Sequence, residues 1–284
     1  MNKKIFYLHI LKTAGSSMNS FLTSQFQEDE SLTHIESKID FKNEEDLKKA
    51  DEYKVLSGHI QLPQMQNKLK VFNSRITLST FRIPMEHVIS HIAWVRKLGD
   101  ESEKKRLLQH EDTVQKIVKK LLTVDLTQAK EITKFIAWLE KEKIYLFHDT
   151  QTKYLSGGGN KIEANTINIA LQNLNKLDFV GVSERLIEFQ LMLCDTFDWK
   201  FTQESIKENA NTSYYGLNIN DESIRKALQP LIQWDTLIYR TARERFIDDM
   251  HSFLAKLEKN SVPRFSSVKV PVITEQHRIK YEKK

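Results

Sequence analysis

A lysine, a threonine, two small residues and two serines follow one another in the segment Lys12-Thr13-Ala14-Gly15-Ser16-Ser17, directly after an apolar run. This composition suits an anion, because glycine permits a tight turn, successive backbone N–H groups can converge, and a following helix adds positive potential. Lys12 adds a full charge. The Walker A pattern G-x-x-x-x-G-K-[ST] is absent. The segment predicts an anion cradle, with an ordinary strand-to-helix turn as the alternative.

Two further polar groups follow the next stretch of β-branched residues. Arg82 comes after residues 75–81, and Ser90 lies two turns into the helix that Pro84 begins. A guanidinium fork with a hydroxyl suits a phosphate monoester. Taken alone, Arg82 is more typical of a surface ion pair.

Histidines supply the other candidate chemistry. His59 follows the short predicted strand 53–56 and could act as a general base, because imidazole titrates near neutral pH, although such a histidine is more often structural. His87 and His91 have the i, i+4 spacing of zinc ligands on a helix. No glutamate lies between them and no third ligand is visible, so we expect no metal site.

The surrounding elements alternate between strands and helices. Predicted strands cover 5–11, 53–56, 75–81 and 179–182. Predicted helices cover 18–26, 44–51, 85–97, 162–174, 184–197 and 230–257. We expect Ser16 or Ser17 to cap the first helix. The pattern predicts an α/β fold with a mostly parallel sheet, whose ligands bind at the carboxyl ends of the strands.

The charged stretch 99–143 keeps helical spacing and predicts a helical insert, with Phe135 and Trp138 in its core. We expect one domain over 1–260 that contains this insert. A basic, loosely packed extension over 261–284 should follow it.

The composition excludes several classes of protein. The 284 residues are 40% hydrophobic and 29% charged, too apolar for a disordered chain and too charged for a membrane protein. The net charge of +5 favours anionic ligands without indicating nucleic acid. The single cysteine, Cys194, excludes a disulfide framework and is expected in a buried helix. Without a cleavable signal or a long apolar run, we expect no membrane span and a cytoplasmic location.

Taken together, the three sites resemble the carbohydrate sulfotransferases of the Golgi type and their bacterial relatives, the family that contains the heparan sulfate 2-O-sulfotransferases. The similarity spans roughly residues 5 to 246 in order. The matching segments are F-Y-L-H-I-L-K-T-A-G-S-S at 6–17 (family pattern H-I-P-K-T-G-G-T-[ST]), 75–91 with F-R-I-P (R-D-P-x-x-R-x-x-S-x-[YF]), Q-T-K-Y-L at 151–155 (Q-T-R-Y-L), F-V-G-V-S-E-R at 179–185 (V-G-[LV]-[ST]-E-R), N-A-N-T-S at 209–213, and D-T-L-I-Y at 235–239.

The resemblance implies a P-loop-like fold and transfer of a sulfuryl group from 3′-phosphoadenosine 5′-phosphosulfate (PAPS) to a hydroxyl, without a metal. Lys12 would contact the bridging oxygen and the 5′-phosphate, the backbone and hydroxyls of residues 13–17 would close the cradle, and Arg82 with Ser90 would hold the 3′-phosphate. His59 would be the catalytic base. The roles of the residues in other matching segments, namely Lys153, Tyr154 and Glu184, stay open.

The chain departs from the family pattern at Leu11, Ala14, Ile83, His87 and Ile92. The first two replace a proline and a glycine of the donor loop. The others replace an acid, an arginine and an aromatic residue near Arg82. These departures affect the rigidity of the loop at 12–17 and the ion pairs that Arg82 can form.

Two other functions remain compatible with the sequence: a nucleotide kinase or NTPase on the same fold, and a non-catalytic module that binds anionic glycans. If the chain is a sulfotransferase, we expect its acceptor to be a hydroxyl-bearing molecule, namely a saccharide. The sequence leaves open the position that is sulfated and the oligomeric state. The missing anchor suggests a bacterial-style enzyme.

Overall fold

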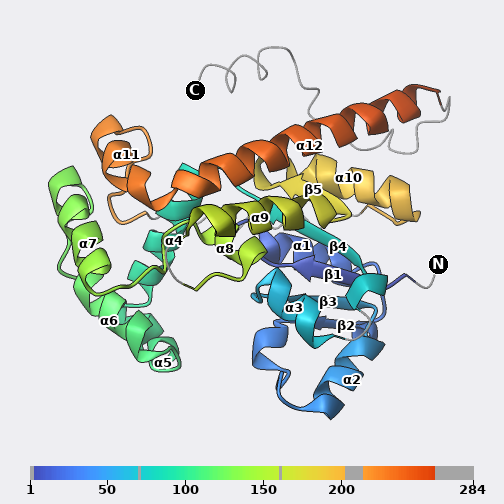
Figure 1. Cartoon of the computed structure of the whole chain (residues 1–284), viewed down its shortest axis with the longest axis horizontal. Coiled ribbons are helices and arrows are strands. Elements are labelled where there is room, and N and C mark those ends of the chain that lie inside the picture. The colour runs from blue at the N-terminus through green and yellow to red at the C-terminus, as the bar shows by residue number, and fades with distance from the viewer. Residues whose placement is uncertain (1–2, 70–71, 160–161, 202–213, 260–284) are drawn as a thin grey trace.

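In the computed structural model, which describes residues 3–69, 72–159, 162–201 and 214–259, five strands form one all-parallel sheet (Figure 1). The strands are β1 (Ile5–Leu8), β2 (Ser31–Thr33), β3 (Val55–Gly58), β4 (Ile76–Phe81) and β5 (Phe179–Val182). Their order is β2-β3-β1-β4-β5. This confirms the predicted α/β class and is consistent with a P-loop-like fold.

Helices flank the sheet and also form an arm beside it. The α-helices of the described residues are α1 (Gly15–Thr23), α2 (Glu44–Glu52), α3 (Leu62–Lys68), α4 (Pro84–Lys97), α5 (Lys104–Leu107), α6 (Asp112–Leu121), α7 (Ala129–Lys141), α8 (Thr150–Ser156), α9 (Ala164–Lys176), α10 (Leu186–Phe197), α11 (Glu222–Leu228) and α12 (Gln233–Lys259). Within this described part, none of them is both long and apolar enough to cross a bilayer.

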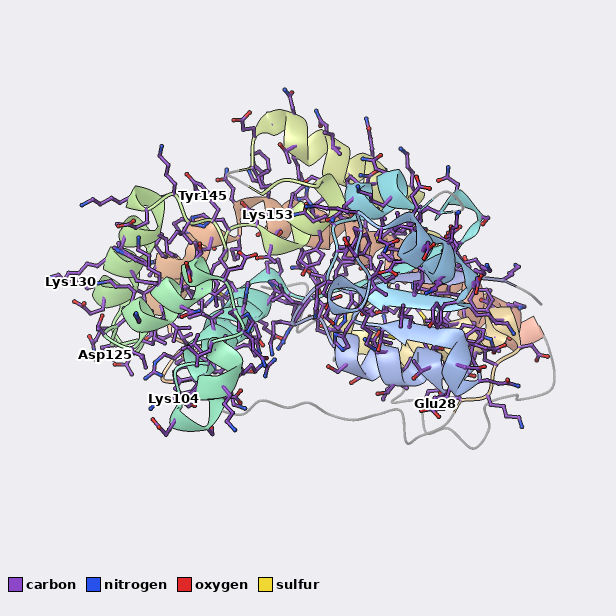
Figure 2. The ribbon with its side chains drawn as sticks, turned by 90° about the horizontal axis from the view of Figure 1, so that it is seen from below. Glu28, Lys104, Asp125, Lys130, Tyr145 and Lys153 are labelled. Atoms are coloured by element: carbon purple, nitrogen blue, oxygen red, sulfur yellow. The ribbon has the colours of Figure 1, made fainter. Side chains whose placement is uncertain are left out.

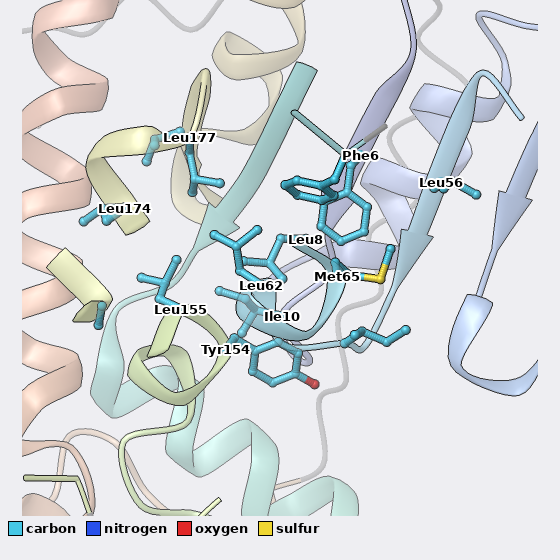
Figure 3. Close-up of a cluster of buried hydrophobic side chains, with 14 of the residues drawn as sticks. Phe6, Leu8, Ile10, Leu56, Leu62, Met65, Tyr154, Leu155, Leu174 and Leu177 are labelled. Carbon is cyan, nitrogen blue, oxygen red and sulfur yellow. The ribbon is translucent and has the colours of Figure 1, made fainter. Parts of the chain in front are cut away.

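Alternation along β1 builds a separate hydrophobic core on each face of the sheet. Phe6 and Leu8 belong to a cluster with α3, α8 and α9, part of which is drawn in Figure 3. Ile5 and Tyr7 belong to the opposite cluster, with α1 and α10. Both faces of the strand are therefore covered, as its continuous apolar sequence predicts.

A third cluster lies away from the sheet, between α4, α6, α7 and α11. Figure 1 shows α5, α6 and α7 as an arm that α4 connects to the sheet. The predicted insert over 99–143 is thus helical. Phe135 is buried in its core, and Trp138 is half-buried against the same cluster.

Some of the predictions for single residues are confirmed and one is wrong. Cys194 is buried in α10, and Pro84 begins α4, as predicted. The cap expected at Ser16 or Ser17 is wrong: α1 begins at Gly15, and its N-cap is Ala14, without a side-chain hydrogen bond. Strand β2 was not predicted. The segments 209–213 and 261–284 lie outside the described residues.

The buried guanidinium of Arg75 connects β1 with α2 and with the turn after α2 at the amino end of the sheet. Arg75, 3% exposed, donates through Nη1 to the carbonyls of Ile5 (3.3 Å) and Tyr53 (3.0 Å). Its Nη2 donates to the carbonyls of Ala50 and Asp51, both at 3.1 Å. One side chain thereby serves carbonyls of β1, of α2 and of the turn between α2 and β3.

We expect Arg75→Met to lower the free energy of unfolding by about 3–5 kcal/mol, because buried carbonyls would lose their donor while the side-chain volume changes little. Urea unfolding at neutral pH measures the loss. The exposed Arg240→Met is the matched control and should stay within about 0.5 kcal/mol of the wild type. A loss below about 1 kcal/mol in Arg75→Met would contradict this account of the packing.

Candidate functional site

The three predicted site segments meet at one edge of the sheet. Strand β1 pairs with β3 on one side and β4 on the other, and Leu8 lies opposite Gly58 and Ser79. Since all three strands are parallel, the loop after β1, His59 after β3 and Arg82 after β4 emerge on the same side. The structure therefore brings together the residues that the sequence singled out as an anion cradle, a base and a phosphate-binding arginine.

The backbone of the loop takes a left-handed conformation twice. Lys12 has φ 62° and Ala14 has φ 66°, whereas Gly15 is not among the positive-φ residues and begins α1. The tight turn that the sequence assigns to Gly15 thus falls on its neighbours. A Cβ at Gly15 would lie 1.7 Å from Nε2 of His9, so glycine is required there for the close approach of the His9 ring.

Three successive carbonyls of the loop are held from β4 and α4. They accept hydrogen bonds in order: Leu11 O from His87 Nε2 at 2.9 Å, Lys12 O from Arg82 Nη1 at 3.3 Å, and Thr13 O from Thr80 Oγ1 at 2.9 Å. A trans peptide directs its N–H opposite to its C=O. The N–H groups that follow these carbonyls therefore point away from β4 and α4.

The start of α1 adds further donors. The first N–H groups of a helix lack partners within it, which here concerns Gly15, Ser16 and Ser17. Ser16 is exposed and Ser17 is buried. The hydroxyl of Thr13 is committed elsewhere, since it donates to the carbonyl of Ile10 at 2.8 Å. Thr13 can therefore offer an anion its backbone but not its side chain.

Lys12 lies among positive charges. Burial lowers the pKa of its ammonium group, and the charges of Arg82, Lys97 and Arg106 lower the pKa further. Within the described residues, Lys12 forms no ion pair, whereas Arg82 lies 3.4 Å from a carboxylate oxygen of Glu86. A half-buried cation beside other cations favours an added anion.

The main chain of Arg82 is fixed by two side chains distant in sequence. Gln151 accepts from Arg82 N at 2.9 Å through Oε1 and donates to Arg82 O at 3.0 Å through Nε2. Glu184 accepts from Ile83 N at 2.7 Å. This gives Glu184 a positioning role that the sequence left open, and it adds Gln151, which appeared only within a matching motif.

The geometry defines the tautomer of His59. Its Nδ1 lies 2.8 Å from the carbonyl oxygen of His9, and a carbonyl can only accept, so Nδ1 carries a proton and, in the neutral ring, Nε2 carries the lone pair. Burial lowers the pKa of His59, and the carboxylate of Glu36, which accepts from His59 N at 2.9 Å, opposes this effect. The net lowering of the pKa favours the neutral ring, the form in which Nε2 can accept a proton.

Three residues behind His59 were not singled out as site residues in the sequence: His9, Asn19 and Ser57. The His9 ring packs against His59 with centroids 4.0 Å apart and the two planes tilted by 39°. A short polar relay supports His9, because Asn19 Nδ2 lies 3.4 Å from its Nδ1 and Ser57 donates to Asn19 Oδ1 at 2.6 Å. His9 lies within the matching segment 6–17, and its ring fills the space that glycine leaves open at residue 15.

The other candidates lie as follows. Ser90 is buried on α4, and its hydroxyl makes no hydrogen bond to Arg82 among the described residues. Lys153 donates to the carbonyl of Tyr145, and both residues are labelled in Figure 2. Tyr154 lies at the edge of the core in Figure 3, and its hydroxyl bonds to the backbone of Leu11.

The buried histidines predict an acid-sensitive fold. Burial lowers the pKa of His87 to about 4 from 6.5, so the folded state binds fewer protons than the unfolded state between these values. Its stabilising contribution is present above pH 6.5 and is lost as the pH falls. The loss from His87 alone amounts to about 2 kcal/mol between pH 6.5 and pH 5.

We expect His87→Gln to reduce the loss of stability between pH 7 and pH 5 by about 2 kcal/mol relative to the wild type. Chemical denaturation at both pH values measures the difference. The exposed His251→Ala should retain the wild-type pH dependence. Equal losses in His87→Gln and the wild type would show that His87 is not held neutral.

Comparisons with protein-family models, with curated proteins and with solved structures found no match to this chain. The candidate site consists of the loop after β1 with its oriented N–H groups and Lys12, of Arg82, and of His59. All three lie at the carboxyl edge of the sheet.

Proposed function

We propose that the chain is a sulfotransferase that moves a sulfuryl group from PAPS to an acceptor hydroxyl. The observation that supports this most strongly is the donor loop, whose carbonyls are held by β4 and α4 while Lys12 and the helix α1 concentrate positive potential. Such a loop fits the 5′-phosphosulfate group. The ordered motifs of the sequence agree with this assignment.

The donor would be held at two points. Lys12 and the N–H groups of residues 13–17 would hold the 5′-phosphate and stabilise the charge that develops on the bridging oxygen as the S–O bond breaks. Arg82 would hold the 3′-phosphate through the N–H donors that its contacts with Lys12 O and Glu86 leave over. Ser90 would join it only if its buried side chain became accessible, since it does not contact Arg82 here.

His59 would act on the acceptor. The lone pair on Nε2 would take the proton of the hydroxyl while its oxygen attacks sulfur and the 5′-phosphate oxygen leaves, which gives a sulfate ester, 3′-phosphoadenosine 5′-phosphate and an imidazolium. The hydrogen bond from Nδ1 to the His9 carbonyl would stabilise that imidazolium. This chemistry depends on positioning and charge more than on covalent help, as in phosphoryl transfer.

We propose a carbohydrate hydroxyl as the acceptor and the cytoplasm as the place of reaction. The acceptor rests on the resemblance of the motifs, and the location rests on the expectation from the sequence that the chain carries no targeting signal or membrane span. The cations Lys97 and Arg106, which lower the pKa of Lys12 from α4 and α5, extend the positive potential toward the arm.

Thermal unfolding with 3′-phosphoadenosine 5′-phosphate tests the donor site. At a ligand concentration one hundred times Kd, we expect about 2.7 kcal/mol of stabilisation of the wild type. Arg82→Ala should lose most of this stabilisation, because the 3′-phosphate would lose its guanidinium. Arg240→Ala, exposed on α12, is the matched control and should behave as the wild type.

ATP and ADP with magnesium serve as comparators in the same experiment. They lack a 3′-phosphate, so they should stabilise the protein less. A larger shift with ATP and magnesium would favour a nucleotide kinase. No shift with any nucleotide, together with salt-sensitive binding of an anionic glycan that survives Lys12→Ala and His59→Ala, would favour a non-catalytic glycan-binding module.

A further inference from the structure

A cluster of three metal-binding side chains lies beside the predicted base. His34 directly follows β2, His59 directly follows β3, and Glu36 lies in the short helix η2 (Ile35–Ser37). Strands β2 and β3 pair in register, Thr33 with Ser57, which brings these loops side by side. One potential ligand atom from each of the three side chains lies within 4.8 Å of the other two.

The carboxylate of Glu36 reaches His59 because the neighbouring residue, Gly58, has no side chain. Its Oε2 accepts from His59 N at 2.9 Å. A Cβ on Gly58 would lie 2.5 Å from this oxygen, so a glycine is needed for the carboxylate to reach its position. The second oxygen, Oε1, lies 3.4 Å from Nδ1 of His34.

The hydrogen bond of His59 to His9 also determines which ring nitrogen is available as a ligand. Nδ1 is held by the His9 carbonyl at 2.8 Å, which leaves Nε2 as the ligand atom. A backbone carbonyl on the other ring nitrogen is the usual support of a metal-ligating histidine, since it fixes the tautomer and the orientation of the ring.

We propose that His34, Glu36 and His59 form a binding site for a divalent transition metal of the zinc type. Two histidines and a carboxylate are a common zinc ligand set, and three protein ligands leave a coordination position open. Ligands about 2.0–2.1 Å from a tetrahedral ion lie about 3.4 Å apart, as His34 Nδ1 and Glu36 Oε1 do. The ligand atoms of the three side chains lie up to 4.8 Å apart, and a rotation of the His34 side chain, which is 52% exposed, would bring them closer together.

The consequence for catalysis rests on the proposed function. The metal would occupy the Nε2 lone pair that must receive the proton of the acceptor hydroxyl. Metal binding and general-base action at His59 therefore exclude each other, and the metal-bound protein is the inhibited form. Binding of the metal itself does not require the sulfotransferase activity.

Isothermal titration with ZnCl₂ at pH 7.5 tests the site on the full chain. The wild type should bind one Zn²⁺ ion that His34→Ala and Glu36→Gln bind at least about tenfold more weakly. Glu36→Gln retains an oxygen that can accept from His59 N, so it separates loss of a ligand from loss of the fold. His251→Ala, an exposed histidine on α12, should bind as the wild type does.

Unchanged zinc affinity in both His34→Ala and Glu36→Gln, or no zinc binding by the wild type, would overturn the proposal. Titration of the same samples with 3′-phosphoadenosine 5′-phosphate separates the two hypotheses. Zinc binding without nucleotide binding would support the metal site and refute the donor site. Nucleotide binding with zinc affinity independent of His34 would refute the metal site alone.

Discussion

The arrangement of the site depends on three hydrogen bonds that hold consecutive carbonyls after β1, those of Leu11, Lys12 and Thr13. Two non-glycine residues of this loop have positive φ, a conformation that costs of order 1 kcal/mol each for an L-residue. The donors from β4 and α4 compensate for this cost. They also determine which way the N–H groups face, and so where an anion can bind.

Arg82 links this loop to the rest of the molecule. Its guanidinium holds the carbonyl of Lys12, while its own main chain is held by Gln151 from α8. The backbone N–H of Gln151 donates in turn to Asp235, a buried carboxylate at the start of α12. Glu184, after β5, completes the clamp through Ile83. Segments about a hundred residues apart thus fix one arginine.

The sequence predicts much of this site because parallel strands place their carboxyl ends together. Residues that follow different parallel strands, such as Lys12, His59 and Arg82, had to lie at the same edge of the sheet if the strands were assigned correctly. The strand order, in which β1 lies between β3 and β4, makes them neighbours. The buried runs of β1 and β4 made that assignment possible. Strand β2, with three half-buried residues, has too short a pattern to detect.

The contacts that hold these groups could not be predicted. The need for glycine at residue 15 comes from the ring of His9, and the need for glycine at residue 58 comes from the carboxylate of Glu36. Neither contact leaves a local pattern, because each depends on how two loops approach in space. The Ser cap failed for a related reason: the left-handed Ala14, held by the tertiary contacts of the loop, occupies the N-cap position instead.

A crystal structure grown with 3′-phosphoadenosine 5′-phosphate tests the central claim most directly. We predict that the 5′-phosphate lies on the N–H groups of residues 13–17 within reach of Lys12, and that the 3′-phosphate contacts Arg82. His59 should face the position where the sulfuryl group would be attached. A nucleotide bound at another part of the sheet, or a 5′-phosphate outside the loop after β1, would contradict the account.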